Sequence, residues 1–293
     1  MMSQTLIESF LKKHQLPADY LLAVNDWFFP VVEKLLAEQQ ALKKPLIIGI
    51  NGTQGSGKTT LTDLFHTVFE EQYQLKVASL SIDDFYLTRQ ERACLADTVH
   101  PLMATRGVPG THDIDLAMQT IAQLLQTDKE TLIPRFDKAN DDRCNESEWT
   151  SVTGPVDVII FEGWCLGARP QSLEQLSTTV NDLEENEDSD LVWRYYVNQQ
   201  LQDSYLQLFN LIDKWIMLKA PSFDCVYNWR LEQEQKLRSS ISDPQMTMDD
   251  LAIARFVKFY QRITQHLLKT LPDKVDFLFE LNSQRQVTKL LKK

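Results

Sequence analysis

The chain has 293 residues, 43% of them hydrophobic, which is enough for one large α/β domain or two small ones. The 41 acidic residues outnumber the 30 basic ones, and the net charge of −11 argues against broad binding of nucleic acid or of anionic membranes. No apolar run has the length of a membrane span, and the four cysteines lack metal-ligand or disulfide spacing. We therefore expect a reduced, cytoplasmic protein, either a monomer or a homodimer.

The first 42 residues are expected to be helical, because large apolar side chains from Phe10 to Leu36 recur at helical spacing. We interpret residues 1–42 as an N-terminal helical extension packed on the core, and residues 43–293 as the domain that carries the chemistry. A role of the extension in dimerisation or in substrate contact remains an alternative.

A short apolar strand is predicted at Leu46–Ile50, and a complete G-x-x-x-x-G-K-[ST] phosphate loop follows it at once. Apolar residues then recur at helical spacing from Leu61 to Val68, so the loop opens a helix. With both flanks correct, this context disfavours a chance Gly-Ser turn. We expect backbone N–H groups and the Lys58 ammonium to bind nucleotide phosphates, and the Thr59 hydroxyl to bind Mg²⁺. The residues predicted to contact the nucleotide are Gly52, Thr53, Gln54, Gly55, Ser56, Gly57, Lys58, Thr59 and Thr60.

A second strand is predicted at 75–81, and the paired carboxylates of Asp83 and Asp84 follow it. Open α/β sheets bind ligands at the ends of their strands, so the pair is a candidate base and metal-shell group, although an Asp-rich turn is the alternative. Residues 89–110 are expected to be irregular. Asp113 is a candidate N-cap of the next helix, and His112 beside it could be a surface residue or a donor to an anionic substrate.

A third apolar strand at 156–161 runs into Glu162, which is typical of a carboxylate that orders Mg²⁺ beside a phosphate loop. Two charged stretches flank this strand. Residues 132–143 mix both signs and could form a solvated loop, and the six acids within 182–190 are expected to be solvated and without function.

A long helix is predicted at 192–212, a fourth strand at 214–219, and an amphipathic helix at 227–238. Arg230 and Arg238 lie on one face of this helix, where they could close over the phosphates as a lid or form surface ion pairs. A capping box at 247–250 begins a further helix, 275–281 is the last strand, and 287–293 is a short tail. The five strands alternate with helices and predict a three-layer α/β/α sandwich with a mostly parallel five-stranded sheet, the P-loop NTPase fold.

Several motifs together resemble the plant-type D-glycerate 3-kinase family, which has fungal and bacterial kinase-like relatives. These motifs are Gly-Thr-Gln-Gly-Ser-Gly-Lys-Thr-Thr at 52–60, Ser-Ile-Asp-Asp-Phe-Tyr-Leu-Thr at 81–88, Arg-Gly-Val-Pro-Gly-Thr-His-Asp at 106–113, Pro-Arg-Phe-Asp-Lys-Ala-Asn-Asp at 134–141, Phe-Glu-Gly-Trp-Cys-Leu-Gly at 161–167 and Tyr-Asn-Trp-Arg-Leu-Glu-Gln-Glu at 227–234. The resemblance covers about residues 45–281. It departs from the plant pattern at Val108 and Cys165. More distantly, the chain is similar to uridine kinases, phosphoribulokinases and bacterial pantothenate kinases.

The resemblance implies transfer of the γ-phosphoryl group of ATP, with Mg²⁺, to a hydroxyl of a small acceptor. It implies that Asp83 is the base, that Glu162 and Thr59 belong to the metal site, and that Lys58, Arg230 and Arg238 are catalytic. The residues that it places in acceptor binding are Asp83, Asp84, Tyr86, Arg106, His112, Arg135 and Lys138. The positive charge of the last four, Arg106, His112, Arg135 and Lys138, suits a carboxylate such as D-glycerate.

Three alternatives remain at this point. The first is a kinase for another acceptor, such as pantothenate, a nucleoside or a sugar acid. The second is a nucleotide-dependent ATPase or regulator, although the guanine signature N-K-x-D is absent. The third is a non-catalytic scaffold, which the intact Lys58, Thr59, Asp83 and Glu162 disfavour.

Overall fold

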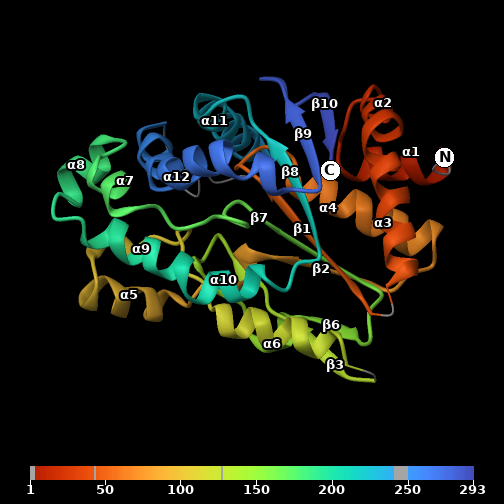
Figure 1. Cartoon of the computed structure of the whole chain (residues 1–293), viewed down its shortest axis with the longest axis horizontal. Coiled ribbons are helices and arrows are strands. Elements are labelled where there is room, and N and C mark those ends of the chain that lie inside the picture. The colour runs from red at the N-terminus through yellow and green to blue at the C-terminus, as the bar shows by residue number, and fades with distance from the viewer. Residues whose placement is uncertain (1–3, 43, 127, 241–249) are drawn as a thin grey trace.

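The computed structural model describes residues 4–42, 44–126, 128–240 and 250–293, without the side chains of residues 4, 233 and 236–240. A six-stranded sheet in the order β10-β9-β8-β1-β7-β2 separates two layers of helices (Figure 1). The strands are β1 (Leu46–Gly52), β2 (Val77–Ser81), β7 (Val158–Gly163), β8 (Lys214–Lys219), β9 (Phe277–Leu281) and β10 (Val287–Lys292).

All five predicted strands are confirmed, and neighbouring members of the set pair in parallel. The predicted strand number is wrong by one, because residues 287–292 form β10 instead of a tail. β10 pairs antiparallel with β9 through the turn at 282–286. One half-buried residue is followed by two exposed ones, twice, so the segment lacks the period of two by which a strand is recognised.

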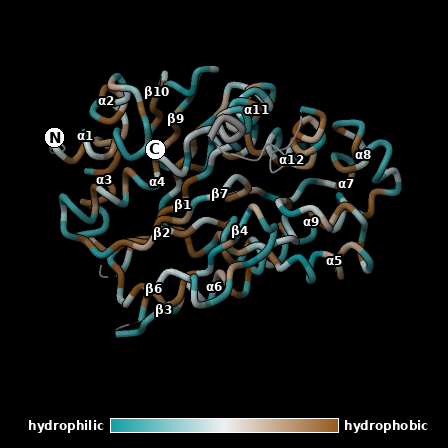
Figure 2. Tube along the Cα trace, turned by 180° about the vertical axis from the view of Figure 1, so that it is seen from behind, coloured by the Kyte–Doolittle hydropathy of each residue, from teal (hydrophilic) through white to brown (hydrophobic). Residues whose placement is uncertain are grey.

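The two faces of the sheet belong to two hydrophobic clusters, because successive side chains of a strand point to opposite sides. Leu46 and Ile48 of β1 join one cluster, and Ile47 joins the other. Hydrophobic residues concentrate along β1 and β2 in the interior (Figure 2). Helices α1 (Gln4–Lys13), α2 (Tyr20–Ala23), α3 (Phe29–Ala41) and α4 (Lys58–Thr67) cover one face, and α6 (Ile114–Leu124), α9 (Val192–Gln202), α10 (Ser204–Phe209) and α12 (Asp250–Thr270) cover the other.

The predicted irregular stretch at 89–110 is wrong in its first half, where α5 (Arg89–Thr98) and a short 3₁₀ helix (Pro101–Ala104) form. Thr88 and Glu91 make a reciprocal capping box, with Thr88 Oγ1 accepting from the Glu91 N–H and the Glu91 carboxylate accepting from the Thr88 N–H. The one buried residue of α5 is Arg92, so the helix has no apolar stripe by which it could be recognised.

The charged stretch at 132–143 contains regular structure, including one short hairpin. β3 (Glu130–Ile133) pairs with β6 (Thr150–Thr153), and β4 (Phe136–Asp137) pairs with β5 (Asp142–Arg143). The turn between β4 and β5 is closed by Asp137, whose carboxylate accepts hydrogen bonds from the N–H groups of Ala139 and Asn140.

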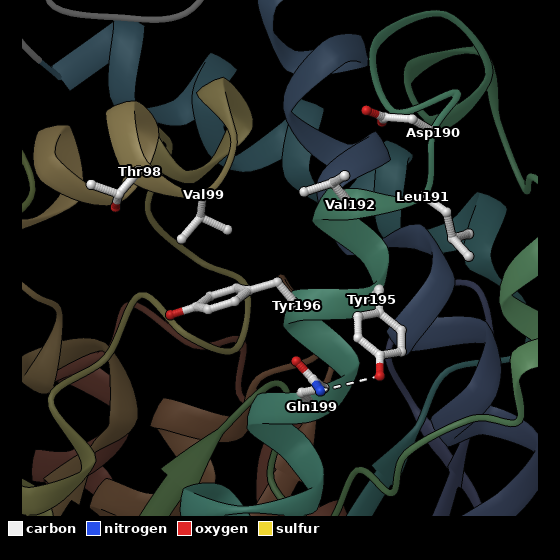
Figure 3. Close-up of a pocket in the computed structure, with 8 residues that line it drawn as sticks. All are labelled: Thr98, Val99, Asp190, Leu191, Val192, Tyr195, Tyr196 and Gln199. Atoms are coloured by element: carbon white, nitrogen blue, oxygen red, sulfur yellow. Dashed lines mark hydrogen bonds between the residues drawn. The ribbon is translucent and has the colours of Figure 1, made fainter.

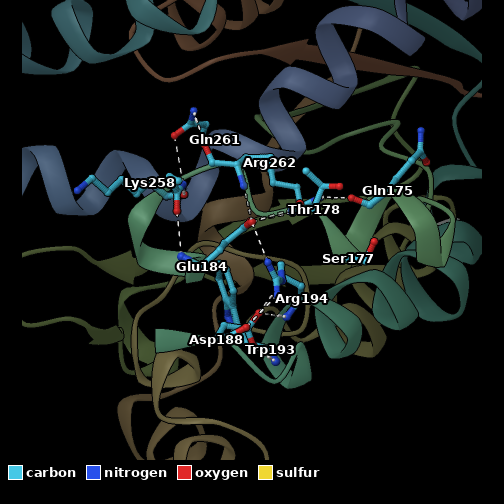
Figure 4. Close-up of polar contacts among 12 residues, drawn as sticks. Gln175, Ser177, Thr178, Glu184, Asp188, Trp193, Arg194, Lys258, Gln261 and Arg262 are labelled. Atoms are coloured by element: carbon cyan, nitrogen blue, oxygen red, sulfur yellow. Dashed lines mark hydrogen bonds and ion pairs between the residues drawn. The ribbon is translucent and has the colours of Figure 1, made fainter. Parts of the chain in front are cut away.

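The acidic stretch 182–190 is not the solvated loop that we expected. It forms α8 (Asp182–Glu187) next to α7 (Leu173–Ser177), and the side chains of Glu184 and Asp188 are fully buried. Arg194 pairs with both carboxylates, and Arg262 of α12 donates to Glu184 from Nε at 2.7 Å (Figure 4). Two buried arginines thus make these acids part of the interior. Arg194 lies close in the chain, but Arg262 comes from a distant helix, and the local sequence carries no sign of it.

The helices predicted in the C-terminal third of the chain have different outcomes. The helix predicted at 192–212 is two helices, α9 and α10, which meet at Asp203 with non-helical backbone angles. The amphipathic helix is confirmed as α11 (Phe223–Ser240). The capping box at 247–250 begins outside the described residues. In the described part of the chain, no helix has both the length and the hydropathy that crossing a bilayer requires.

Candidate active site

The phosphate loop joins the end of β1 to the start of α4. Gly55 and Gly57 both have positive φ, at 76° and 90°, and Gly57 is the N-cap of α4. A Cβ on Gly55 would lie 2.6 Å from the Cβ of Trp229 in α11, so only glycine fits between the loop and this helix. The sequence therefore places a glycine loop at a helix N-terminus, where backbone N–H groups bind anions.

Glu162 lies at the end of β7, next to β1, and meets the first turn of α4. Its Oε1 accepts from the Thr59 hydroxyl at 3.4 Å, and its Oε2 lies 3.8 Å from the Lys58 ammonium. The Glu162 side chain is buried, so its charge acts in a weakly screened environment. The structure brings these three predicted residues together.

Several polar atoms here are buried without a hydrogen-bond partner among the described residues. They are Glu162 Oε2, Thr53 Oγ1, Gln54 Oε1 and Ser56 Oγ. Buried polar groups are nearly always paired, so such a group of unsatisfied atoms fits a polar ligand. A carboxylate and a hydroxyl oxygen are also the donors that Mg²⁺ prefers. The residues present thus fit nucleotide phosphates and a magnesium ion.

Asp83 follows β2 in a 3₁₀ turn (Ile82–Phe85) and has partners on both carboxylate oxygens. Tyr86 donates from its hydroxyl to Oδ1 at 2.9 Å, and Lys138 donates from Nζ to Oδ2 at 2.7 Å. Burial acts to raise the pKa of Asp83, but the charges of Lys138 and Lys58 outweigh burial and hold the pKa well below its usual range. Asp83 is therefore ionised, and Lys58 of the phosphate loop is close enough to affect its pKa.

Asp84 beside it has a different environment. Arg135 donates from its guanidinium to Asp84 Oδ2 at 2.8 Å and from Nε to Thr150 Oγ1 at 3.1 Å. Burial nevertheless raises the pKa of Asp84 to about 6, with the charge of Asp83 adding to the effect and that of Arg135 opposing it. The two adjacent carboxylates thus have pKa values on opposite sides of the ordinary one, a pattern typical of functional sites.

His112 is buried next to Tyr86, with the two rings stacked at 4.5 Å. Its Nδ1 lies 2.5 Å from the Tyr205 hydroxyl, and that hydroxyl also accepts from the Gly110 N–H. Burial lowers the pKa of His112 to about 3, so the ring is neutral. Its Nε2 has no partner in the part of the chain that the structure describes, which leaves one polar atom for a ligand.

Arg106 belongs to a separate group. Its guanidinium pairs with Asp141, to which the buried Arg92 also donates, and both guanidinium groups lie over the ring of Phe136. This group fixes the end of the β4–β5 hairpin. Arg106 is therefore paired with a carboxylate of the hairpin. Lys138 instead contacts Asp83, and Arg135 contacts Asp84.

Arg230 follows Trp229 in α11. Its guanidinium pairs with Glu234 at 2.6 Å and lies over the ring of Phe256 in α12. The side chain is mostly buried, and its charge affects the pKa of Tyr260, as does that of Asp83. Arg230 is thus near the site but is held by a carboxylate. The side chain of Arg238 lies outside the described part of the structure.

Sequence reasoning missed two residues that support the site. Arg285, from the β9–β10 turn, donates from Nε to the Gly55 carbonyl at 2.9 Å and lies over the ring of Trp229. Tyr260 of α12 donates from its hydroxyl to the Arg106 carbonyl at 3.2 Å. The periodicity of α12 showed only that Tyr260 faces the interior, and no local signal marked Arg285.

A separate open pocket of about 430 Å³ lies between the end of α5 and the start of α9 (Figure 3). Its lining includes Val99, Asp190 and Tyr196 and none of the predicted site residues. Tyr196 also packs against Gly110, where a Cβ would lie 2.7 Å from its ring. The pocket therefore adjoins the loop that precedes His112, and it is not part of the phosphate site.

Comparison with known proteins places this site in a family. The model of the Phosphoribulokinase / Uridine kinase family matches residues 47–185, from the phosphate-loop strand to α8. The uncharacterized kinase mug58 of Schizosaccharomyces pombe is 34% identical over 258 residues, which cover 84% of this chain and 90% of the relative. The chloroplastic D-glycerate 3-kinase of Arabidopsis thaliana is also 34% identical, over 78% of this chain but only 48% of the relative, so the chain spans about half the length of that protein.

Among solved structures, a D-glycerate 3-kinase from Cryptococcus neoformans superposes with a TM-score of 0.74 at 26% identity. The superposition covers 89% of this chain and 96% of that one. The likeness therefore extends beyond the phosphate loop to nearly the whole of a solved kinase.

Proposed function

The chain belongs to the phosphoribulokinase/uridine kinase family of P-loop kinases, and on that basis we propose that it is an ATP-dependent kinase that converts D-glycerate to 3-phosphoglycerate. The observation that carries the proposal is that a candidate nucleotide site and a candidate acceptor site lie next to each other. A phosphate loop with Lys58 and Glu162 adjoins an ionised Asp83 that is surrounded by cationic side chains.

In this proposal, the loop N–H groups and Lys58 bind the β- and γ-phosphates of ATP. Thr59 and Glu162 would hold Mg²⁺, which supplies positive charge to the phosphates when it is bound. Arg230 would add a further positive charge if its guanidinium left Glu234 and paired with the phosphates of the nucleotide. Arg238 is a second candidate for closing over the phosphates. The protein thus contributes mainly position and electrostatic stabilisation.

Asp83 is proposed as the base because its carboxylate is ionised and lies near the phosphate-binding lysine. The acceptor hydroxyl oxygen bonds to the γ-phosphorus, and the bond from that phosphorus to the bridging oxygen breaks. The electron pair of that bond leaves with ADP, while the hydroxyl proton moves to Asp83. The ionised carboxylate therefore needs no prior proton loss to accept it.

A carboxylate acceptor is favoured by the charge around Asp83. Lys138 and Arg135 supply cations, and the neutral His112 offers Nε2 as a hydrogen-bonding atom. Tyr86 and Asp84 complete the proposed acceptor site. Arg106 contributes indirectly, because its ion pair with Asp141 fixes the turn between β4 and β5. D-glycerate has one carboxylate and two hydroxyl groups, which matches this mixture of cations and polar atoms.

Two further proposals concern the rest of the chain. We infer that residues 1–42 are a helical extension of the kinase domain formed by 43–293, since Phe28 packs on Phe279 of β9 at 5.2 Å between ring centroids. We also propose a cytoplasmic protein, because Cys94, Cys144, Cys165 and Cys225 are all free thiols. Neither bears on the reaction.

The proposed function is tested by measuring ADP release from ATP and Mg²⁺ with a panel of acceptors. The panel is D-glycerate, pantothenate, uridine, ribulose 5-phosphate and other sugar acids, with Lys58→Met as the inactive control for contaminating kinases. We expect D-glycerate to stimulate ADP release and the product to be 3-phosphoglycerate. Stimulation by another acceptor alone would make that compound the substrate in place of D-glycerate. Acceptor-independent turnover throughout would favour an ATPase.

A further inference from the structure

We propose that Lys138 is a substrate-released lock on Asp83, so that its ammonium occupies the base until the carboxylate of the acceptor takes that ammonium away. The inference rests on the proposed function, because it requires a carboxylate acceptor and a proton-accepting Asp83. It adds a reason why the enzyme would not hydrolyse ATP when no acceptor is bound.

The contacts of Asp83 describe the locked state. Tyr86 and Lys138 occupy one carboxylate oxygen each, at 2.9 and 2.7 Å. A carboxylate that is paired with an ammonium accepts a proton less readily, because the ammonium stabilises its ionised form. A hydroxyl or a water molecule would also have to compete with the ammonium for Oδ2. Asp83 in this arrangement is a poor base.

The backbone that carries Lys138 is fixed from both sides, so release requires only a side-chain movement. Asp137 closes the turn by accepting from the Ala139 and Asn140 N–H groups. Asp141, on the other side of the turn, is bound by Arg92 and Arg106. The hairpin therefore keeps its place while the Lys138 ammonium moves.

Lys138 is also the cation of the site that exchanges its partner most easily. Its side chain is 61% exposed, and within the described residues its ammonium contacts no carboxylate other than that of Asp83. Arg135 is held by both Asp84 and Thr150, and Arg106 is held by Asp141. An exposed lysine on a flexible stem exchanges one carboxylate for another at little cost in free energy.

The lock would suppress the wasteful reaction with water. When water replaces the acceptor, its oxygen bonds to the γ-phosphorus, the bond to the bridging oxygen breaks, and ADP leaves with the electron pair. The proton would again go to Asp83, and inorganic phosphate would be the product. Occupation of Asp83 by Lys138 hinders this proton transfer. A bound acceptor carboxylate draws the ammonium away, so that Asp83 can accept the proton of the acceptor's own hydroxyl.

The test compares phosphate release from ATP and Mg²⁺ without acceptor, and phosphorylation of D-glycerate and of glycerol, in four proteins. These are the wild type, Lys138→Met, Lys138→Arg and the matched control Lys13→Met. The Lys13 side chain is about as exposed as that of Lys138, and its ammonium pairs with Asp63 at 2.9 Å. Lys13 makes no ion pair with Asp83.

We expect Lys138→Met to raise basal hydrolysis about fivefold, the scale of an exposed ion pair, and to raise glycerol phosphorylation relative to wild type. Its kcat/KM for D-glycerate should fall about tenfold or more with the loss of a charge-assisted contact. Lys138→Arg keeps the charge and should keep hydrolysis low, and Lys13→Met should match the wild type. A purely structural role would lower every activity together.

Unchanged or lower basal hydrolysis in Lys138→Met, in a protein whose wild type forms 3-phosphoglycerate, would overturn the lock and leave the proposed function intact. An equal rise in hydrolysis in Lys13→Met would also overturn it, because the effect would not be specific to Asp83. Failure of the wild type to phosphorylate D-glycerate would remove the proposed function, and the lock with it.

Discussion

Arg285, near the C-terminal end of the chain, donates a hydrogen bond from Nε to the carbonyl oxygen of Gly55 in the phosphate loop, at 2.9 Å. The same guanidinium lies over the ring of Trp229 at 5.4 Å and pairs with Glu232. Trp229 in turn packs directly against Gly55. The β9–β10 turn and α11 therefore both contact the loop and fix its backbone, whose N–H groups are proposed to bind phosphates.

The first prediction concerns this support. Arg285→Ala should raise the KM for ATP about tenfold with a smaller change in kcat, because a hydrogen bond to a charged group contributes about 1.5 kcal/mol or more to the bound geometry. The measurement is steady-state kinetics with varied ATP. Arg255→Ala is the control, since Arg255 also lies over an aromatic ring and pairs with Glu187 but has no contact with the loop. Equal KM values for Arg285→Ala and the control would contradict the prediction.

The second prediction concerns the proposed base. Asp83→Asn should lower kcat at least about 100-fold, the usual contribution of a positioned proton acceptor, and leave the dissociation constant of ATP nearly unchanged. Single-turnover kinetics and equilibrium nucleotide binding measure the two quantities separately. A variant that loses ATP binding together with turnover would show that Asp83 serves the nucleotide and not the acceptor.

The third prediction concerns pH and His112. Burial lowers the pKa of folded His112 to about 3, while the unfolded residue titrates near 6.5. Between these values the unfolded state binds the additional proton, so the free energy of unfolding falls as the pH is lowered. The contribution of His112 is complete above pH 6.5 and decreases by up to about 1.4 kcal/mol per unit below it.

His112→Gln carries no titrating group, so its free energy of unfolding should decrease less than that of the wild type as the pH falls. From pH 6.5 to 5 the difference between the two proteins should change by about 1.6 kcal/mol. Denaturant unfolding at several pH values provides the measurement. Two curves that stay parallel across this range would show that the folded protein accommodates a charged His112.

The fourth prediction concerns the buried charge cluster of Glu184, Asp188, Arg194 and Arg262. Arg262→Met should lower the free energy of unfolding by about 3–5 kcal/mol, because it leaves the buried Glu184 carboxylate with one cation fewer. Arg255→Met removes an exposed ion pair and should change stability by less than about 1 kcal/mol. Similar losses in the two variants would show that the buried pair is no stronger than the exposed one.

Local sequence determined five of the six strands of the sheet and the phosphate-loop half of the candidate site. The five apolar strands and the glycine loop between β1 and α4 could be predicted, because strand burial and phosphate-loop geometry both depend on residues close together in the chain. Glu162 and Asp83 followed from the same logic, since acids at the ends of neighbouring parallel strands meet at one edge of the sheet. β10 and α5 were missed because neither has an apolar pattern of the usual period.

Only the tertiary structure decided which charges pair. The acids of α8 appeared solvated from the sequence, yet Glu184 is buried against an arginine that lies 78 residues later. Lys138 and Arg135 could be assigned to a charged loop but not to Asp83 and Asp84, and Arg285 showed no connection with Gly55. The physical reason is that a charge takes its energy from whatever lies within a few ångströms, and chain folding alone brings those neighbours together.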